Sequence, residues 1–228
     1  MTDIRKDTAI VLRTVPYSET SLILTLFSAR HGRVSLIAKG ARRRHKNGSA
    51  LAIEPGYELE VVWSAKSSRE VQLARELALV NSHWGMRKSL ESMVLCSAVI
   101  ELLLQTTSED DPHPELYKAA EICLQQFEAS RSPNWTTFWK FYLVLLNQLG
   151  FAVNDRVIES GVPFSLSVES TAVLKKVSSS GFDVASRIRT SIRAESEIFH
   201  WLTKYASEHL PVVVHSRSIS ALKWVRPS

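Results

Sequence analysis

The hydrophobic pattern of this 228-residue chain changes its period near residue 82. Before that point, apolar residues alternate with polar ones over short stretches, as in half-buried β-strands. After it, they recur every three to four residues, as in helices that pack on one face. The sequence therefore predicts an α+β protein of two domains, with β-structure over residues 1–80 and an all-α domain over residues 81–228.

The β domain holds five strand patterns separated by breaks, several of which contain Gly or Pro. They cover residues 8–15, 21–27, 33–38, 57–63 and 69–77. Short strands in this number and spacing are typical of a small closed barrel. We expect a five-stranded OB-fold, although an SH3-like barrel fits the pattern nearly as well.

The all-α domain is expected to contain several helices bounded by Pro, Gly and Ser. Long helices are predicted over residues 84–105, 114–129, 132–149 and 194–210, and short ones over 168–177 and 218–224. Residues 151–166 show no period and are predicted to be irregular.

A basic run lies between the third and fourth strand patterns, and it predicts a nucleic-acid site. Residues 1–80 hold 13 Lys and Arg against 8 Asp and Glu, whereas the remainder holds 15 of each, so the whole net charge of +5 lies in the β domain. A polyanion relieves the repulsion between such charges, and OB-folds add aromatic faces that stack on bases. The predicted DNA-binding residues are Lys39, Arg42, Arg43, Arg44 and Lys46, extended by Arg30 and Arg33. The aromatic candidates for stacking are Tyr17, Phe27, Tyr57 and Trp63.

An aromatic stripe in the all-α domain has two interpretations. Trp135, Phe138, Trp139 and Tyr142 fall at helical spacing, which core packing explains. The alternative is an apolar groove with a basic rim that binds an acidic–apolar peptide. For that alternative, the predicted partner-binding residues are Arg131, Trp135, Trp139 and Lys140.

The sequence carries no catalytic signature, and we expect no enzyme, no catalytic residue and no metal. It has neither a P-loop nor a Gly-x-Ser-x-Gly elbow. The acidic cluster Glu109-Asp110-Asp111 could serve a metal-dependent nuclease, but it precedes Pro112 in a helix connection, where a solvated acidic loop is the simpler interpretation. Cys96 and Cys123 form no Cys-x-x-Cys pair and are expected to be buried, reduced thiols.

The N-terminal residues include no apolar signal segment, and no apolar stretch approaches the length of a membrane span. We therefore expect a cytoplasmic, nucleoid-associated protein without a membrane partner.

Residues 9–43 resemble the opening of the RecO family of bacterial recombination mediators. The resemblance lies in the turn Tyr17-Ser18-Glu19, the turn glycine Gly32 and the loop Lys39-Gly40-Ala41-Arg42. Near the C-terminus, His215-Ser216-Arg217-Ser218 is similar to the family's Ser-Arg segment. The order of barrel and helices also matches.

This resemblance implies an OB-fold and a helical domain in a protein without covalent chemistry. Such proteins bind single- and double-stranded DNA and anneal complementary strands. They work with RecR, help RecA to displace single-strand-binding protein from DNA, and recognise the acidic C-terminal tail of that protein. The competing hypothesis is an RNA-binding OB-fold protein without a role in recombination.

The chain departs from the family pattern in one segment. Many members carry two Cys-x-x-Cys pairs that bind zinc after the long apolar helix, but residues 151–171 contain no Cys. We therefore expect no zinc and no other cofactor. Packing must hold this segment instead, with Phe151, Val162 and Phe164 as candidates.

Overall fold

The computed structural model describes residues 3–42, 52–66, 68–130, 133–210 and 216–225. The chain forms two compact units, which we describe separately. The first contains Met1–Trp84 and Leu103–Tyr117, and the second contains Gly85–Leu102 and Lys118–Ser228.

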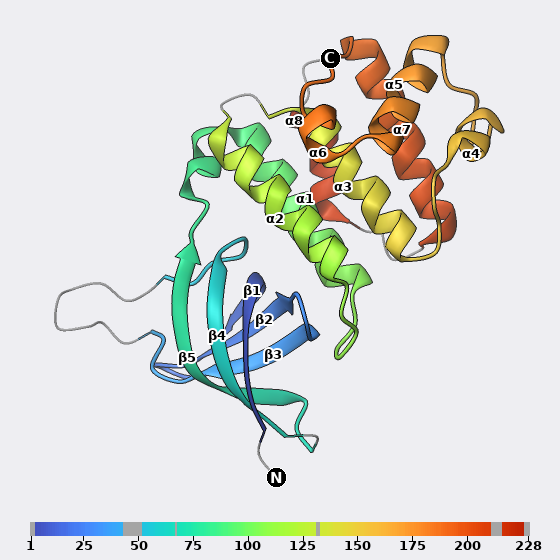
Figure 1. Ribbon diagram of the computed structural model, residues 1–228. Coiled ribbons are helices and arrows are strands. Elements are labelled where there is room, and N and C mark those ends of the chain that lie inside the picture. The colour runs from blue at the N-terminus through green and yellow to red at the C-terminus, as the bar shows by residue number, and fades with distance from the viewer. Residues whose placement is uncertain (1–2, 43–51, 67, 131–132, 211–215, 226–228) are drawn as a thin grey trace. The chain divides into compact units, whose positions relative to one another are not determined.

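The first unit is built on a closed five-stranded barrel (Figure 1). Its strands pair in the order β1-β2-β3-β5-β4, and β4 pairs back with β1. The predicted five-stranded OB-fold is thereby confirmed. The strands are β1 (Asp3–Pro16), β2 (Leu22–Ser28), β3 (Gly32–Ala38), β4 (Glu58–Ala65) and β5 (Val71–Asn81).

Strand β1 closes the barrel because it serves two partners. Its first part, from Asp3 to Ile10, pairs with β4, and its second part, from Ala9 to Pro16, pairs with β2. The register to β2 shifts between Val11 and Arg13, where an irregularity of this kind bends a strand. β1 begins five residues earlier than the alternation predicts, because its polar first residues hide the pattern.

The barrel is buried on both faces of β1. Inside, Ala9 and Val11 pack with the apolar side chains of the other strands. On the opposite face Ile10 is also fully buried. Phe27 lies 6.1 Å, centroid to centroid, from Tyr117 of the same unit. The Tyr117 hydroxyl donates to Glu58 at 2.9 Å, so residues 103–117 cover part of the barrel's outer surface.

Gly32 allows the acidic turn between two helices to approach the barrel closely. Its φ is +65°, in the left-handed region that favours glycine. A Cβ atom at this position would lie 2.4 Å from the carbonyl oxygen of Asp111. The backbone N–H of Arg33 donates to the carbonyl of Ser108 at 3.0 Å. The sequence predicts a turn at Gly32, and the structure shows in addition that the turn lies against the backbone of Asp111.

Replacing Gly32 with alanine is expected to lower the free energy of unfolding by about 2 kcal/mol or more, since it adds both backbone strain and a clash with backbone atoms. Urea denaturation measures the change. Gly181→Ala is the matched control, because Gly181 has a φ of −74° and no atom within 4 Å of the position that an added Cβ would take. Equal midpoints for the two variants would contradict this role of Gly32.

The second unit is all-helical in its described residues, and the end of α1 and the start of α2 belong to the first unit. Side chains of Asn134 and Ser191 cap the N-termini of α3 and α7. The helices are η1 (Trp84–Lys88), α1 (Leu90–Thr106), α2 (Pro114–Ala129), α3 (Trp135–Gln148), α4 (Asp155–Glu159), α5 (Val168–Ser179), α6 (Phe182–Ala185), α7 (Ile192–His209) and α8 (Arg217–Val225).

Two predicted boundaries need correction. Residues 84–88 form a separate 3₁₀ turn rather than the start of α1. Residues 151–166, predicted to be irregular, contain the short helix α4, which the side chain of Asn154 caps by accepting a hydrogen bond from the N–H of Val157 at 3.1 Å. Only Ile158 of this helix is buried, so the sequence has no apolar periodicity from which α4 could be predicted.

The cysteine-free segment packs against α7. The Phe151 ring lies 5.0 Å from His209, and the Phe164 ring lies 5.2 Å from His200, between ring centroids. The indole N–H of Trp201 donates to the carbonyl of Phe164 at 3.1 Å. Of the three predicted packing residues, Phe151 and Phe164 therefore make these contacts, whereas Val162 is 51% exposed.

Candidate nucleic-acid interface

The beginning of the basic loop is fixed to a neighbouring turn. Lys39 follows β3 and is exposed. The backbone N–H of Arg42 donates to the carbonyl of Thr20, and its guanidinium donates to the carbonyl of Ser18, each at 3.0 Å. Only one arm of the guanidinium is used in this contact, so the rest of its donors can face a phosphate. The turn between β1 and β2 thus positions Arg42 at the start of the loop.

The same turn presents an exposed aromatic side chain. Tyr17 is 61% exposed, and its backbone N–H donates to the carbonyl of Ser21 at 3.0 Å, which closes the turn. Phe27, Tyr57 and Trp63 are at most 5% exposed and belong to the core. Of the four aromatic candidates, Tyr17 therefore has a free face for a base. The alternation of apolar and polar residues in the sequence does not distinguish the exposed Tyr17 from the three buried aromatic residues.

Arg30 and Arg33 lie at the opposite end of β3 from Lys39. Lys39 comes six positions after Arg33 along the chain, which is about 20 Å at about 3.3 Å per residue. The Arg33 guanidinium donates to the carbonyl of Leu104 at 2.9 Å. The Arg30 guanidinium donates to Asp7 at 3.0 Å. The structure does not bring these two arginines together with Lys39 and Arg42, and it uses both in contacts within the unit.

The ion pair of Asp7 with Arg30 is partly buried. Burial raises the pKa of Asp7, but hydrogen bonds from the Ser28 hydroxyl and from Arg30 outweigh it and leave this pKa below its usual range. Asp7 therefore stays ionised and holds Arg30 against β1. Arg43, Arg44 and Lys46, the other predicted cations, lie outside the described residues.

The acidic cluster has separate partners rather than a shared metal site. Glu109 accepts a hydrogen bond from Ser35 at 3.3 Å, Asp110 lies 3.7 Å from Arg5, and Asp111 lies 3.1 Å from His113. Within the described ranges, no group of three His, Cys, Asp or Glu side chains could hold a metal ion. The geometry gives the nuclease hypothesis no support.

The aromatic stripe of α3 lies in the core of the helical unit. Trp139 is fully buried and Trp135 is 4% exposed, so neither indole lines an open groove. Arg131 lies outside the described residues. Of the three described residues predicted to bind a partner peptide, Lys140 is the one that lies at an opening.

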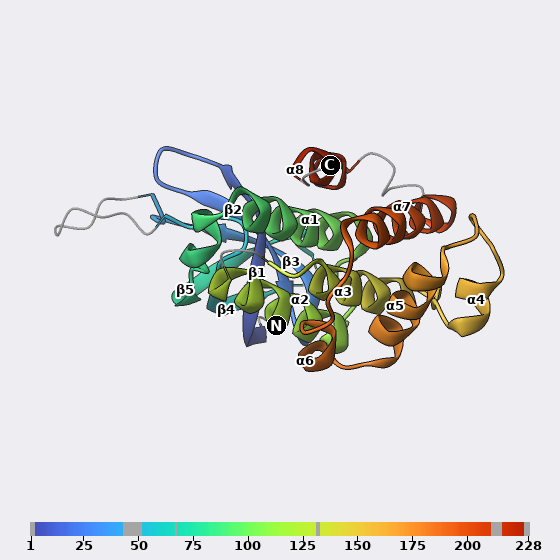
Figure 2. The same ribbon diagram turned by 90° about the horizontal axis from the view of Figure 1, so that it is seen from above.

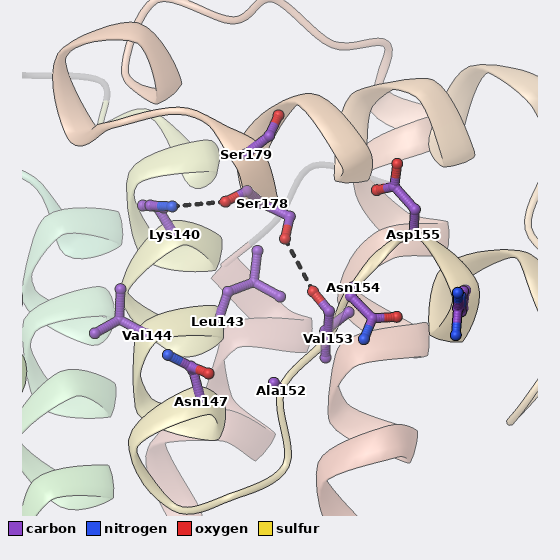
Figure 3. Close-up of a pocket in the computed structure, with 11 residues that line it drawn as sticks. Lys140, Leu143, Val144, Asn147, Ala152, Val153, Asn154, Asp155, Ser178 and Ser179 are labelled. Atoms are coloured by element: carbon purple, nitrogen blue, oxygen red, sulfur yellow. Dashed lines mark hydrogen bonds between the residues drawn. The ribbon is translucent and has the colours of Figure 1, made fainter.

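Lys140 lies at the edge of a pocket of about 630 Å³ between α3, the 152–156 segment and the end of α5 (Figure 3). Its ammonium donates to the carbonyl of Ser178 at 2.9 Å, and the Ser178 hydroxyl donates to the carbonyl of Val153 at 2.9 Å. Burial lowers the pKa of Lys140. The pocket also has an apolar lining, which is formed by Leu143, Val144, Ala152 and Val153.

Among the residues that the structure describes, no helix is both long and apolar enough to cross a bilayer.

An OB-fold barrel with a cation and an exposed aromatic residue at one turn is an arrangement found in many proteins that bind single-stranded nucleic acids. Two family models match this chain: Recombination protein O N terminal over residues 1–83, and Recombination protein O C terminal over residues 87–157. Together they cover more than half of the sequence, and the chain belongs to the RecO family.

Curated relatives agree with this assignment. The chain is 36% identical over 151 residues to "DNA repair protein RecO" of Chloroherpeton thalassium, a stretch covering 66% of this chain and 58% of that protein. It is 37% identical over 155 residues to the protein of the same name from Azoarcus sp., covering 66% and 59%. It is 34% identical over 161 residues to that of Paraburkholderia xenovorans, covering 68% and 50%. The chain therefore spans only about half to three-fifths of the length of these relatives.

Proposed function

We propose that this chain is a DNA repair and recombination mediator that binds single- and double-stranded DNA and anneals complementary strands. It acts through binding rather than covalent chemistry. The observation that carries the proposal is that Arg42 is hydrogen-bonded to the same turn of the OB-fold barrel that presents the exposed ring of Tyr17. Membership of the RecO family supports DNA as the ligand rather than RNA.

The mechanism is electrostatic. Lys39 and Arg42, with the further arginines of the loop, neutralise phosphates on strands that otherwise repel each other. Tyr17 stacks on a base and holds a single strand in an open conformation. Because the remaining bases stay exposed, a complementary strand can pair with them. Neither step consumes a nucleotide or needs a metal ion.

The partners of this function are proteins of the same pathway. The chain works with RecR in the cytoplasm, at the nucleoid, and helps to load RecA onto DNA coated with single-strand-binding protein. The acidic C-terminal tail of single-strand-binding protein is the partner that suits the Lys140 pocket. Its apolar residues match the Leu143 and Val153 side of that pocket, and its carboxylates match Lys140.

The partial burial of Lys140 and its unused hydrogen-bond donors favour an acidic peptide as the ligand. An ammonium carries three donors, of which the Ser178 carbonyl takes one. Because burial already lowers the pKa of Lys140, a carboxylate that enters the pocket gains a partly desolvated partner.

Lys140→Ala is therefore expected to weaken binding of an acidic–apolar tail peptide about tenfold, in line with a hydrogen bond between charged groups. Fluorescence anisotropy of a labelled peptide measures the change. Lys118→Ala is the matched control, because Lys118 is an exposed lysine of the same unit. Equal affinities for the two variants would exclude Lys140 from the peptide site.

Annealing of complementary DNA strands coated with single-strand-binding protein tests the proposed function. Equal affinity for DNA and RNA strands of the same sequence would instead favour the RNA-binding alternative.

A further inference from the structure

The helical unit carries a basic groove between its last two helices, α7 and α8. The groove has a volume of about 210 Å³, and most of its lining residues belong to α7 and α8. Figure 2 shows these two helices in shades of red. Its cationic and imidazole side chains are His200 and Lys204 from α7 and Lys223 from α8. None of the described residues that line it is acidic. Residues 81–228 carry no net charge, so this local excess does not follow from a generally basic domain.

Three hydroxyl groups of the groove already donate hydrogen bonds to backbone carbonyls. Thr203 donates to the carbonyl of Phe199 at 2.9 Å, and Ser207 donates to that of Lys204 at 2.7 Å. Ser220 donates to the carbonyl of Ser216 at 2.9 Å. The donors that remain for an anion are the two ammonium groups and the imidazole. A site held by exposed charges rather than by an enclosing set of hydroxyls suits an extended polyanion better than a small free ion.

Two carboxylates lie near the groove, one beside the groove lysine Lys204 and one bound to the start of α8. Glu208 lies 3.6 Å from Lys204 on the same helix, in a solvent-exposed pair that contributes little. Glu101 accepts hydrogen bonds from the backbone N–H groups of Arg217 and Ser218, at 3.0 and 2.7 Å. It therefore fixes the start of α8 beside α1 within this unit.

An exposed tryptophan lies next to the groove. The Trp224 side chain is 89% exposed, an unusual position for so large an apolar group. It follows Lys223 in the chain and lies one helical turn from Ser220, so helix geometry places it at the rim. Basic side chains beside a free aromatic face match the way proteins hold single strands, with phosphates on the cations and a base on the ring.

We propose that the α7–α8 groove is a second contact site for single-stranded nucleic acid, in which Lys204 and Lys223 hold phosphates and Trp224 stacks on a base. The proposal rests on the proposed function and deepens it, because a chain with two separate strand contacts can hold both strands that it anneals.

The test uses the full chain and a fluorescent oligothymidylate, titrated over a range of salt concentrations. The double variant Lys204→Gln, Lys223→Gln is expected to reduce the slope of log K against log salt by about 1.4, from about 0.7 per phosphate. The matched control is Lys118→Gln, Lys176→Gln, which removes two exposed lysines of the same unit outside the groove. It should leave the slope unchanged.

The stacking contact is tested separately. Trp224→Ala is expected to weaken binding about fivefold or more, and Trp224→Phe should restore most of it. Photo-crosslinking with an oligonucleotide that carries 5-iododeoxyuridine should yield a peptide that contains Trp224.

The outcomes separate the two proposals. If the groove variants bind DNA with the same salt slope and the same crosslinking as the wild-type chain, the groove site alone is overturned. Failure of the wild-type chain to bind DNA would overturn both proposals. An unchanged DNA slope with loss of binding to an oligoglutamate peptide would identify a protein-binding groove and also overturn this inference.

Discussion

Replacing Arg42, Arg43 and Arg44 with alanine should reduce the slope of log K against log salt for single-stranded DNA by about 2, from about 0.7 per phosphate contact. At about 50 mM salt, this corresponds to a loss of affinity of two to three orders of magnitude. Arg42 is anchored to the β1–β2 turn through Thr20 and Ser18, so its charge lies at a defined place on the barrel.

A control for this variant must remove the same charge. Arg187, Arg189 and Arg193 are exposed arginines of the helical unit, and their replacement with alanine also removes three positive charges. We expect the control to keep nearly the wild-type slope. If both triple variants reduced the salt slope by the same amount, general attraction by net charge would explain binding, and the loop would not be the interface.

Tyr17→Ala is expected to weaken binding to single-stranded DNA by about 1 to 3 kcal/mol, because a stacked base loses its aromatic partner. Tyr17→Phe keeps the ring and should bind like the wild type. Because duplex bases are already stacked on each other, affinity for double-stranded DNA should change little. Titrations with both forms of DNA measure the difference.

Tyr17 is well suited to this test because its side chain is exposed. Loss of its ring therefore does not leave a cavity in the barrel. Equal loss of affinity in Tyr17→Ala and Tyr17→Phe would point to the hydroxyl group rather than to stacking. Unchanged affinity in both would remove Tyr17 from the interface.

The architecture was predictable because it depends on periodic burial. The alternation in residues 8–77 and the helical spacing after residue 84 follow from which side chains face a core. The short helices α4 and α6 have five and four residues, too few to establish a period. Their formation depends on local caps and tertiary contacts.

Individual site residues were less predictable, because their environment is set by distant parts of the chain. Arg33 looks like a free surface cation in the sequence, but its partner is the carbonyl of Leu104, 71 residues away. The stripe that contains Trp135 and Trp139 has the same spacing whether it faces a core or a groove, and the structure places both indoles in the core. Trp224 shows no signal in the sequence, since exposure rather than spacing distinguishes it.

We expect the barrel loop to bring complementary DNA strands together without covalent chemistry. The most direct measurement is annealing of two complementary oligonucleotides coated with single-strand-binding protein, without nucleotide or metal. We predict annealing by the wild-type chain and by the triple variant at Arg187, Arg189 and Arg193, but not by the triple variant at Arg42, Arg43 and Arg44. Absence of annealing by the folded wild-type chain, or full activity of the loop variant, would contradict the account.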